Sequence, residues 1–275
     1  NGGLKTGNSV VLAGGAAGDF STMTFDERVE LADTVVQESM GRLPVVMGAQ
    51  TTNTAELIKL AKAAEKVGAE YIQVSPPYYF AATEDDFFEY VLAASEAADI
   101  GLIIYNTFWT SSNVSLEMMD RLVELPNVVG LKWTTPGSFM AFERAVVRFK
   151  DRVNIIDNQV SYVTSHMMGA RGVELHPTNY WPQWGVNTWE LLEKEKYVEA
   201  QQELVKVVIP FYELWEDMAK FTGGDGYLDK LCLELVGVGS SRCRPPTRDV
   251  RDKFREQTRS MLIRSGVPGV LQPSG

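Results

Sequence analysis

The stretch PVVMGAQTTNTAELIKLAKAAEKVGAEYIQVS, residues 44–75, contains the structural unit that repeats along this chain. It opens and closes with short apolar runs rich in β-branched residues, which are typical of buried strands. Between these runs, Asn53 precedes Glu56 by three positions, which indicates a helix start, and Gly68 marks the helix end. The stretch therefore predicts two parallel strands joined by a crossover helix.

Similar apolar runs recur along the chain, and Thr24 and Asn187 indicate further helix starts between them. The expected strands are 9–13, 44–49, 71–75, 101–105, 128–132, 153–157 and 171–175. A closed (β/α)8 barrel needs one strand more. We therefore expect an α/β fold, a (β/α)8 TIM barrel, whose first strand and first helix are missing from the chain. Residues 1–7 would then be the end of that helix and its exit loop.

The part of the chain after Asn187 has a helical pattern throughout. Its first segment would complete the last barrel unit, and the others would form a C-terminal helical region. We therefore predict a barrel domain at 1–190, followed at 191–275 by the last barrel helix and the helical region.

The composition is that of an ordinary globular protein, with 45% hydrophobic and 23% charged residues. A net charge of −10 argues against a nucleic-acid partner, because nucleic acids bind basic surfaces. No apolar run approaches the roughly 20 residues of a membrane span, and the N-terminus lacks the pattern of a signal peptide. Cys232 and Cys243 fit no zinc-binding spacing, so we expect two free thiols in a cytoplasmic protein.

The segment VVGLKWTT, residues 128–135, places a lysine in an apolar run. Because side chains alternate along a strand, Lys132 should point into the barrel while Leu131 and Trp133 face the helices. It would lie at the carboxyl end of its strand, where the catalytic groups of a barrel gather. Burial disfavours the charged ammonium, and a neutral amine can attack a 2-oxo acid to form an imine. The alternative is a structural lysine that pairs with a buried carboxylate or reaches the barrel rim.

A tyrosine ends the preceding strand, in the segment IIYNT at 103–107. The alternation sends Tyr105 inward, and neighbouring strands lie about 4.8 Å apart, so its phenol should be close to the amine of Lys132. A phenol there can move protons while the imine forms and while the substrate is cleaved. The alternative is a core tyrosine bonded to a backbone carbonyl.

The segment GGAAGDFSTMTFDE, residues 14–27, follows the first expected strand. Glycines allow backbone N–H groups to approach an anion, and a helix N-terminus adds positive potential. This loop would suit a substrate carboxylate, and a tight turn between a strand and a helix is the alternative.

Together, these segments resemble the dihydrodipicolinate synthase/N-acetylneuraminate lyase superfamily of class I aldolases. The resemblance extends from VVLAGGAAGDF through SPPYY, YN and GLK to CRPP at 243–246, so it covers essentially the whole chain. It implies a (β/α)8 barrel with a C-terminal helical region, commonly assembled as a homotetramer, with a dimer as the other option. It also implies a lyase that needs neither a metal nor a cofactor and acts on a pyruvate-type 2-oxo acid.

The resemblance assigns roles to individual residues. Lys132 would form the imine with the 2-oxo acid, and Tyr105 would relay protons. Gly15, Ala16, Ala17 and Gly18 match the loop that binds the substrate carboxylate, and Asp19 is a further candidate for substrate binding. Tyr79, or its neighbour Tyr78, matches a tyrosine that some members lend to a neighbouring subunit's site. Asn106 belongs to the matching YN pair and is a further candidate for substrate binding.

The chain departs from the family in this loop and beside the tyrosine. The family usually carries hydroxyl residues where Ala16 and Ala17 stand, and a glutamate where Asp19 stands. The alanines would leave fewer hydrogen bonds for the carboxylate and would remove one link of the tyrosine's proton relay. Thr110 stands where true dihydrodipicolinate synthases have the arginine that holds the aldehyde substrate, so we do not expect that activity.

Aromatic residues follow the expected strand ends and suggest a barrel mouth suited to an apolar or aryl group. They are Tyr78, Tyr79, Phe80, Phe108, Trp109, Tyr180, Trp181 and Trp184. Of these, Tyr79 and Trp109 are expected to contact the substrate, and ordinary loop packing is the alternative. His176 and Asn179 are candidate hydrogen-bond partners of the substrate. A metal site of His176, Glu174 and Asp157 is a further alternative, which a chain with two histidines disfavours.

Three functions remain open at this point. The leading hypothesis is a Schiff-base aldolase that cleaves or joins a C–C bond, with an aromatic or apolar aldehyde as the partner. A 2-keto-3-deoxy sugar acid dehydratase or aldolase is the first alternative, because side chains such as Asn158 and Gln159 could bind sugar hydroxyls. The second is a non-catalytic 2-oxo acid-binding paralogue, in which Ala16 and Ala17 record lost chemistry.

Overall fold

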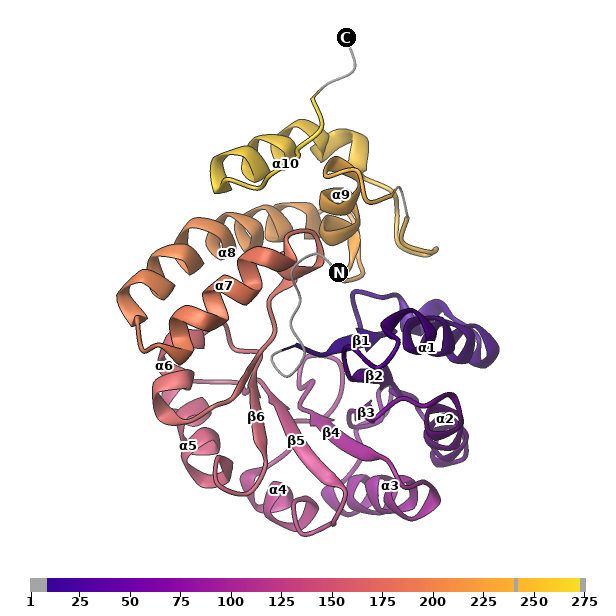
Figure 1. The fold of residues 1–275 in the computed structure, drawn as a ribbon. Coiled ribbons are helices and arrows are strands. Elements are labelled where there is room, and N and C mark those ends of the chain that lie inside the picture. The colour runs from indigo at the N-terminus through magenta and orange to yellow at the C-terminus, as the bar shows by residue number, and fades with distance from the viewer. Residues whose placement is uncertain (1–8, 240–241, 273–275) are drawn as a thin grey trace. The chain divides into compact units, whose positions relative to one another are not determined.

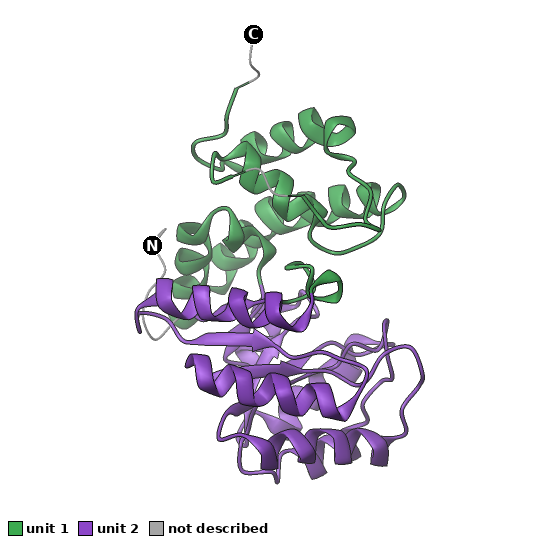
Figure 2. Cartoon of the chain, turned by 90° about the vertical axis from the view of Figure 1, so that its right-hand side faces the viewer, with its two compact units in different colours: residues 1–9, 15–23, 175–275 green, residues 10–14, 24–174 purple. Residues whose placement is uncertain are grey.

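The structure is a computed structural model that describes residues 9–239 and 242–272. The chain divides into two compact units, shown in purple and green in Figure 2. Unit 2 contains residues 10–14 and 24–174, and unit 1 contains residues 1–9, 15–23 and 175–275. The segment expected to end a missing first helix, residues 1–7, lies outside the described residues.

Unit 2, all of whose residues are described, is built on a parallel sheet of seven strands. The strands are β1 (Val11–Ala13), β2 (Val45–Gly48), β3 (Tyr71–Val74), β4 (Gly101–Tyr105), β5 (Val128–Trp133), β6 (Asn154–Asp157) and β7 (Gly172–Val173). Each strand pairs with the next one in sequence, and the sheet curls like part of a barrel (Figure 1). Each expected strand is therefore confirmed, and so is the α/β class, whereas an eighth strand that closes the barrel stays a prediction.

Helices cover the outer face of this sheet (Figure 1). They are α1 (Phe25–Ser39), α2 (Thr54–Val67), α3 (Glu84–Ala97), α4 (Leu116–Leu122), α5 (Phe139–Phe149) and α6 (Tyr162–Met168). The main hydrophobic core lies between the helices and the sheet, and Leu60, Trp133 and Phe142 are at most 1% exposed there. Because Leu131 and Trp133 of β5 point into this core, the alternate positions of the strand point to the inner face.

Local sequence signals set the ends of the first two helices. Thr24 caps α1: its side chain accepts a hydrogen bond from the N–H of Glu27, whose carboxylate accepts one from the N–H of Thr24. Asn53 caps α2 by accepting a hydrogen bond from the N–H of Glu56 at 2.8 Å. Gly68 ends α2 with a φ of 87°, in the left-handed region that favours glycine. These predicted boundaries are confirmed.

The described part of unit 1 is helical. Its elements are η1 (Phe20–Thr22), η2 (His176–Asn179), α7 (Pro182–Glu193), α8 (Tyr197–Ala219), α9 (Tyr227–Leu235) and α10 (Arg251–Ser265). They enclose a second hydrophobic core, in which Phe211, Leu228 and Leu262 are fully buried. The predicted helical character of the C-terminal region is confirmed, and α8 continues through Pro210.

The predicted helix start at Asn187 is wrong. Helix α7 begins earlier, at Pro182, because the fixed φ of proline suits the first helical position. Asn187 lies inside the helix, where its side chain accepts a hydrogen bond from Gln183 at 2.7 Å. The boundary between the two compact units lies after Glu174. It differs from the predicted boundary between the domains at 1–190 and 191–275, and that division into domains stays a prediction.

Candidate active site

Lys132 and Tyr105 lie side by side on the inner face of the sheet. Their Cα atoms are register partners on the neighbouring strands β4 and β5. The Nζ atom of Lys132 lies 4.2 Å from the centre of the Tyr105 ring, and each residue is only 6% exposed. The structure therefore brings the two side chains together at the carboxyl ends of their strands, and their catalytic roles stay predictions.

Glu174 forms an ion pair with Lys132, through its Oε2 atom and Nζ. The Lys132 side chain is 7% exposed and that of Glu174 is 30% exposed. A carboxylate favours the charged form of an amine beside it. The amine of Lys132 therefore lies in contact with a carboxylate, next to Tyr105, and the expectation that burial holds it uncharged stays a prediction.

From the sequence, Glu174 was expected only as an alternative metal ligand. The alternation of side chains continues past β7 and puts Gly172 and Glu174 on the inner face, as β5 puts Gly130 and Lys132 there, but it does not show which side chains meet. The N–H of Glu174 donates to the carbonyl of Asp157 at 3.1 Å, so the backbone keeps its strand pairing at this position.

Asn158 and Thr134 lie beside the phenol of Tyr105. The Asn158 amide donates to the Tyr105 hydroxyl at 3.3 Å and to Oγ1 of Thr134 at 2.8 Å. Oγ1 of Thr134 in turn donates to the Asn158 carbonyl at 2.8 Å. These hydrogen bonds join the ends of β5 and β6 and orient the phenol.

Asn106 uses its amide to hold the loop that follows β4. The side chain is fully buried, donates to Oδ1 of Asn113 at 3.0 Å and to the carbonyl of Thr134 at 2.7 Å, and accepts from the N–H of Val114 at 3.1 Å. These bonds tie the loop that carries Trp109 to the end of β5. A contact between Asn106 and the substrate stays a prediction.

Exposed aromatic residues surround the end of β4 and follow β3. Trp109 is 51% exposed and packs edge-on against Tyr105, with ring centres 5.9 Å apart. Tyr79 and Phe80 form a second pair, which is 86% and 78% exposed, with ring centres 4.7 Å apart. Tyr79 has a φ of 88°, which a bulky residue rarely adopts. Such strain in an exposed loop is typical of a binding segment.

Two residues of the expected aromatic mouth, Tyr180 and Trp184, are buried within unit 1. Tyr180 is 6% exposed and belongs to the second core, stacked against Phe211 with ring centres 6.3 Å apart. Trp181 stacks on Trp184, which is 3% exposed and donates its indole N–H to Glu203 at 3.2 Å. The prediction is therefore wrong for Tyr180 and Trp184, because η2 and α7 follow β7 at once and their packing buries these rings.

The expected carboxylate loop, residues 15–19, belongs to unit 1. The N–H groups of Gly18 and Asp19 close its turn by donating to carbonyls at the start of the loop, at 3.0 and 3.1 Å. Within the described residues, the N–H groups of Ala16 and Ala17 donate to no other backbone group. The loop thus offers two amides to an anion, which is consistent with the carboxylate assignment and does not test it.

Asp19 anchors this loop to the C-terminal part of unit 1. Its carboxylate accepts hydrogen bonds from Nζ of Lys230 at 2.5 Å and from the N–H of Arg244 at 3.2 Å. Burial, together with the negative charge of Asp19, raises the pKa of Cys243 to about 11. A contact between Asp19 and the substrate stays a prediction.

His176 and Asn179 both bind Asp229 within unit 1. Nδ1 of His176 lies 2.9 Å from Oδ2 of Asp229, and the Asn179 amide donates to Oδ1 at 2.9 Å. Asp229 is 3% exposed, and the His176 ring stacks on Phe211 with centres 5.4 Å apart. Asp229 orients both candidate ligands, and the sequence analysis missed it because it lies on α9, far away along the chain.

The residues considered for a metal site have other partners. Asp157 accepts hydrogen bonds from the hydroxyl of Ser165 and the N–H of Gln159, both at 2.6 Å, and burial raises its pKa. In the described ranges, no three or more His, Cys, Asp or Glu side chains are grouped so that they could hold a metal ion.

Both cysteines are free thiols, as predicted. Among the described helices, none is long and apolar enough to span a membrane.

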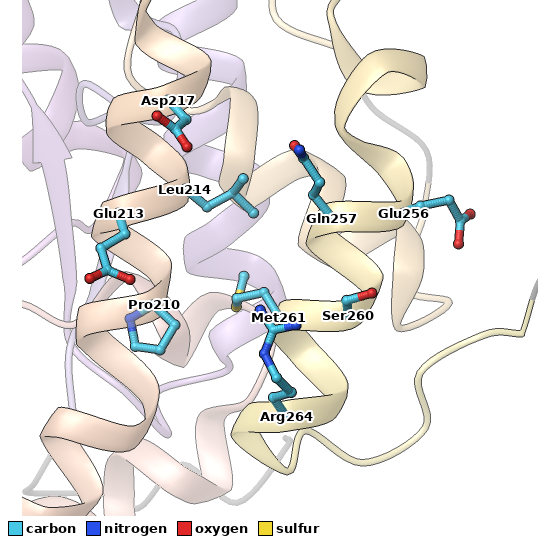
Figure 3. A pocket seen from close by; sticks show the side chains of 9 residues that line it. All are labelled: Pro210, Glu213, Leu214, Asp217, Glu256, Gln257, Ser260, Met261 and Arg264. Carbon is cyan, nitrogen blue, oxygen red and sulfur yellow. The ribbon is translucent and has the colours of Figure 1, made fainter.

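A groove of about 460 Å³ lies between α8 and α10 of unit 1 (Figure 3). Its lining includes Glu213, Asp217 and Glu256 together with Arg264. It contains neither a lysine nor a tyrosine, so it offers no imine-forming group and is not the candidate reaction site.

Known proteins share both the sequence pattern and the fold of this chain. The profile of the dihydrodipicolinate synthetase family matches residues 3–264. The 4-hydroxy-tetrahydrodipicolinate synthase of Bradyrhizobium diazoefficiens is 35% identical over 266 residues, which cover 96% of this chain and 88% of that protein.

Two solved structures show the same fold over most of the chain. The dihydrodipicolinate synthase of Thermotoga maritima has a TM-score of 0.83 and 26% identity, covering 94% of this chain and 88% of that one. The enzyme of Acinetobacter baumannii, complexed with pyruvate, has a TM-score of 0.84 and 21% identity with the same coverage. The chain belongs to the dihydrodipicolinate synthetase family and is a lyase of the aldolase type that this family contains.

Proposed function

We propose that this protein is a Schiff-base lyase in which Lys132 forms an imine with a pyruvate-type 2-oxo acid. The observation that carries the proposal is the buried Nζ atom of Lys132 at a strand end, 4.2 Å from the Tyr105 ring centre. An amine and a phenol in this arrangement supply a nucleophile and a proton carrier. A relative of the same fold was solved in complex with pyruvate, which supports this substrate class.

The proposed reaction depends on a protonated imine, which accepts the electron pair of a breaking C–C bond. The Lys132 nitrogen attacks C2 of a 4-hydroxy-2-oxo acid, and water leaves as the C=N bond forms. The C3–C4 bond then breaks: its electron pair moves toward the imine nitrogen to give an enamine, and the C4 fragment departs as an aldehyde. The C4 hydroxyl passes its proton to Tyr105 as the phenol passes its own proton to solvent. Protonation at C3 and hydrolysis release pyruvate and the free lysine, and the reverse sequence joins the two molecules.

An apolar or aryl aldehyde is the partner that the surroundings of Tyr105 favour. Trp109 packs edge-on against Tyr105 and remains half exposed. Phe108 in turn packs against Trp109, with ring centres 5.2 Å apart. Rings of this kind bind apolar and aryl groups by burial and stacking.

A 2-keto-3-deoxy sugar acid is the second candidate, because buried amides also lie just after β2 and on β3 of this sheet. Gln50 is 1% exposed, and neither its Oε1 nor its Nε2 has a partner among the described residues. Gln73 is 3% exposed, and its Nε2 is likewise unpaired there. A buried amide without a partner costs about 1–3 kcal/mol, so sugar hydroxyls would be favourable ligands for it.

Synthesis of dihydrodipicolinate is not the activity we propose. Thr110 stands where the resemblance leads us to expect an arginine for the carboxylate of the aldehyde substrate. Its hydroxyl donates to the carbonyl of Thr107 at 3.2 Å and supplies no positive charge.

We further propose that the Gly15–Gly18 loop binds the substrate carboxylate, and that the barrel domain extends over residues 1–190. The protein is proposed to act in the cytoplasm as a homotetramer or dimer. The exposed Tyr79 and Phe80 pair supports an assembly, because large exposed rings are typical of interfaces.

Reductive trapping tests the proposed function. The protein is incubated with pyruvate, treated with borohydride and weighed intact by mass spectrometry. The wild type should gain one reduced pyruvyl group, and the Lys132→Arg variant should gain none. A wild-type protein that stays unmodified with pyruvate and with a panel of other 2-oxo acids would support the non-catalytic paralogue.

Substrate turnover separates the two candidate partners. Release of pyruvate from a 4-hydroxy-4-aryl-2-oxobutanoate is compared with consumption of a 2-keto-3-deoxy sugar acid. Faster release from the aryl compound supports the aldehyde pocket beside Trp109. Faster consumption of the sugar acid supports the role of the buried amides.

A further inference from the structure

We infer that Glu174 is the proton acceptor and donor for imine formation on Lys132. The inference rests on the proposed function and adds to it a residue to which the family resemblance gives no role. Glu174 contacts the reacting nitrogen directly, through the ion pair between its Oε2 atom and Nζ of Lys132.

The backbone holds Glu174 where its carboxylate meets the amine. Ile156 on β6 is the register partner of Lys132 on β5 and of Gly172 on β7, so Gly172 lies level with the lysine. Glu174 follows Gly172 by two residues, just past the end of β7. The hydroxyl of Tyr162 donates to the carbonyl of Glu174 at 2.6 Å. The position of the carboxylate is therefore built into the strand ends of unit 2.

Imine formation needs a group that both takes and returns a proton. An ammonium has no lone pair, so Nζ must lose a proton before it can attack C2 of the 2-oxo acid. The hydroxyl of the resulting carbinolamine must then gain a proton to leave as water. One carboxylate in contact with the nitrogen can do both, and it ends the sequence in its original ionised state.

The atoms and charges balance without a further reactant. The ammonium gives a proton to Glu174, and the neutral amine forms the N–C2 bond as the carbonyl π pair moves to oxygen. Transfer of a nitrogen proton to that oxygen gives the neutral carbinolamine. Glu174 then protonates the hydroxyl, the C–O bond breaks, and the nitrogen lone pair forms the C=N bond of a protonated imine.

The composition of the loop, compared with the family that the chain resembles, favours such a group. Ala16 and Ala17 stand where the family usually supplies hydroxyls, one of which forms a link of the tyrosine's proton relay. Tyr105 itself accepts a hydrogen bond from Asn158 at 3.3 Å. With that relay shortened, the carboxylate on Nζ offers a direct route for the proton.

The ion pair would slow imine formation, and not speed it, if Glu174 only kept the amine of Lys132 in its charged form. Removing a storage carboxylate would release neutral amine and speed imine formation at neutral pH. Removing a proton carrier would slow it, because proton transfer by a positioned group contributes about 10²–10⁴-fold. The sign of the rate change therefore separates the two roles.

The experiment measures the rate at which borohydride-trapped pyruvyl adduct accumulates, by rapid quench and intact mass, between pH 6 and about 10. The variants are Glu174→Gln, Glu174→Asp and a control, Glu117→Gln, which removes an exposed carboxylate of the same unit that is paired with Arg148. Within unit 2, Lys132 on β5 forms the ion pair with the Glu174 carboxylate, Tyr105 on β4 packs against that lysine, and Tyr162 on α6 donates to the backbone carbonyl of Glu174.

Glu174→Gln should form the adduct about 10²–10⁴-fold more slowly than the wild type at neutral pH. Its rate should rise steeply with pH as hydroxide replaces the carboxylate, and its final yield should match the wild type. Glu174→Asp should recover part of the rate, and Glu117→Gln should match the wild type throughout.

Equal or faster trapping by Glu174→Gln at neutral pH would overturn the inference. So would the complete absence of adduct at every pH in a variant that circular dichroism shows to be folded, because Glu174 would then build the site without moving the proton. Failure of the wild type to trap any 2-oxo acid is a separate outcome, which overturns the proposed function and this inference with it.

Discussion

Lys132 differs from the exposed lysines of this chain in the environment of its charge. The side chains of Lys194 and Lys220 are 63% and 68% exposed, and ion pairs of such exposed lysines contribute at most about 1 kcal/mol. The Lys132 side chain is 7% exposed. Desolvation of a buried charge can cancel the Coulombic attraction of its ion pair, so the pair of Lys132 is weak evidence for a stabilising role.

Tyr105 is expected to act in the cleavage of the C3–C4 bond and not in the formation of the imine. Tyr105→Phe should lower turnover about 10²–10⁴-fold, because the C4 hydroxyl loses its proton acceptor. Trapping of pyruvate on Lys132 should continue at a rate close to that of the wild type, since Glu174 remains. Steady-state turnover and trapping, measured on the same preparation, check both halves. Unchanged turnover would remove Tyr105 from the mechanism.

Cys243 should be a poorly reactive thiol at neutral pH. Its pKa is raised to about 11 by burial and by the charge of Asp19, so thiolate forms only in strongly alkaline solution. The rate of reaction with a disulfide reagent should therefore keep rising with pH up to about 11. Asp19→Asn should move the midpoint of this profile downward, because it removes a negative charge. A midpoint near 9 in the wild type would contradict this account.

At the scale of elements, the period-two alternation of the strands made much of the site predictable. Lys132 and Tyr105 each occupy an inward-facing position of their strand, and consecutive strands in this fold are neighbours. The partner of Lys132 could not be deduced in this way. Contact with Glu174 depends on how far a side chain two strands away reaches across a curled sheet, which no local pattern encodes.

The start of α7 shows why one helix boundary was missed. Asn187 is a good capping residue by type, but Pro182 starts the helix before it. Thr24 and Asn53 had no such competitor nearby, and both cap their helices as predicted.

The loop at residues 15–18 should bind a carboxylate more tightly when its hydroxyls are restored. A hydrogen bond to a charged acceptor contributes about 1.5–3 kcal/mol, so Ala16→Thr with Ala17→Thr should lower the half-saturating pyruvate concentration at least about tenfold. The measurement is the concentration dependence of trapping.

The matched control for this loop replaces Ala16 and Ala17 with valine, which has the shape of threonine without its hydroxyl. The valine variant should bind pyruvate no better than the wild type. Equal tightening by valine would assign the effect to packing, and no tightening by threonine would mean that another group holds the carboxylate.

At the scale of the whole molecule, the limits of sequence analysis lie in contacts between distant segments of unit 1. Asp229 on α9 orients His176 and Asn179, and Lys230 with Arg244 anchors Asp19. Each of these contacts joins segments more than 45 residues apart along the chain, and none follows from a motif. The order of the strands and helices, in contrast, followed from their repeat.

The exposed pair Tyr79 and Phe80 should be part of a contact between copies of this chain. Sedimentation of the wild type should give an integer multiple of the chain mass. Tyr79→Ser with Phe80→Ser should weaken the assembly, because it removes two rings that are 86% and 78% exposed in the single chain. Val147→Ser, which changes an exposed apolar residue of α5, should leave it unchanged. A monomeric wild type would contradict the proposed assembly.

The most direct test of the account is the location of the covalent bond to the 2-oxo acid. Protein treated with pyruvate and borohydride is digested, and the modified peptide is sequenced by mass spectrometry. The account predicts one reduced pyruvyl group on Lys132, in the peptide that contains VVGLKWTT. Modification of any other lysine in preference to Lys132, or of none, would contradict it.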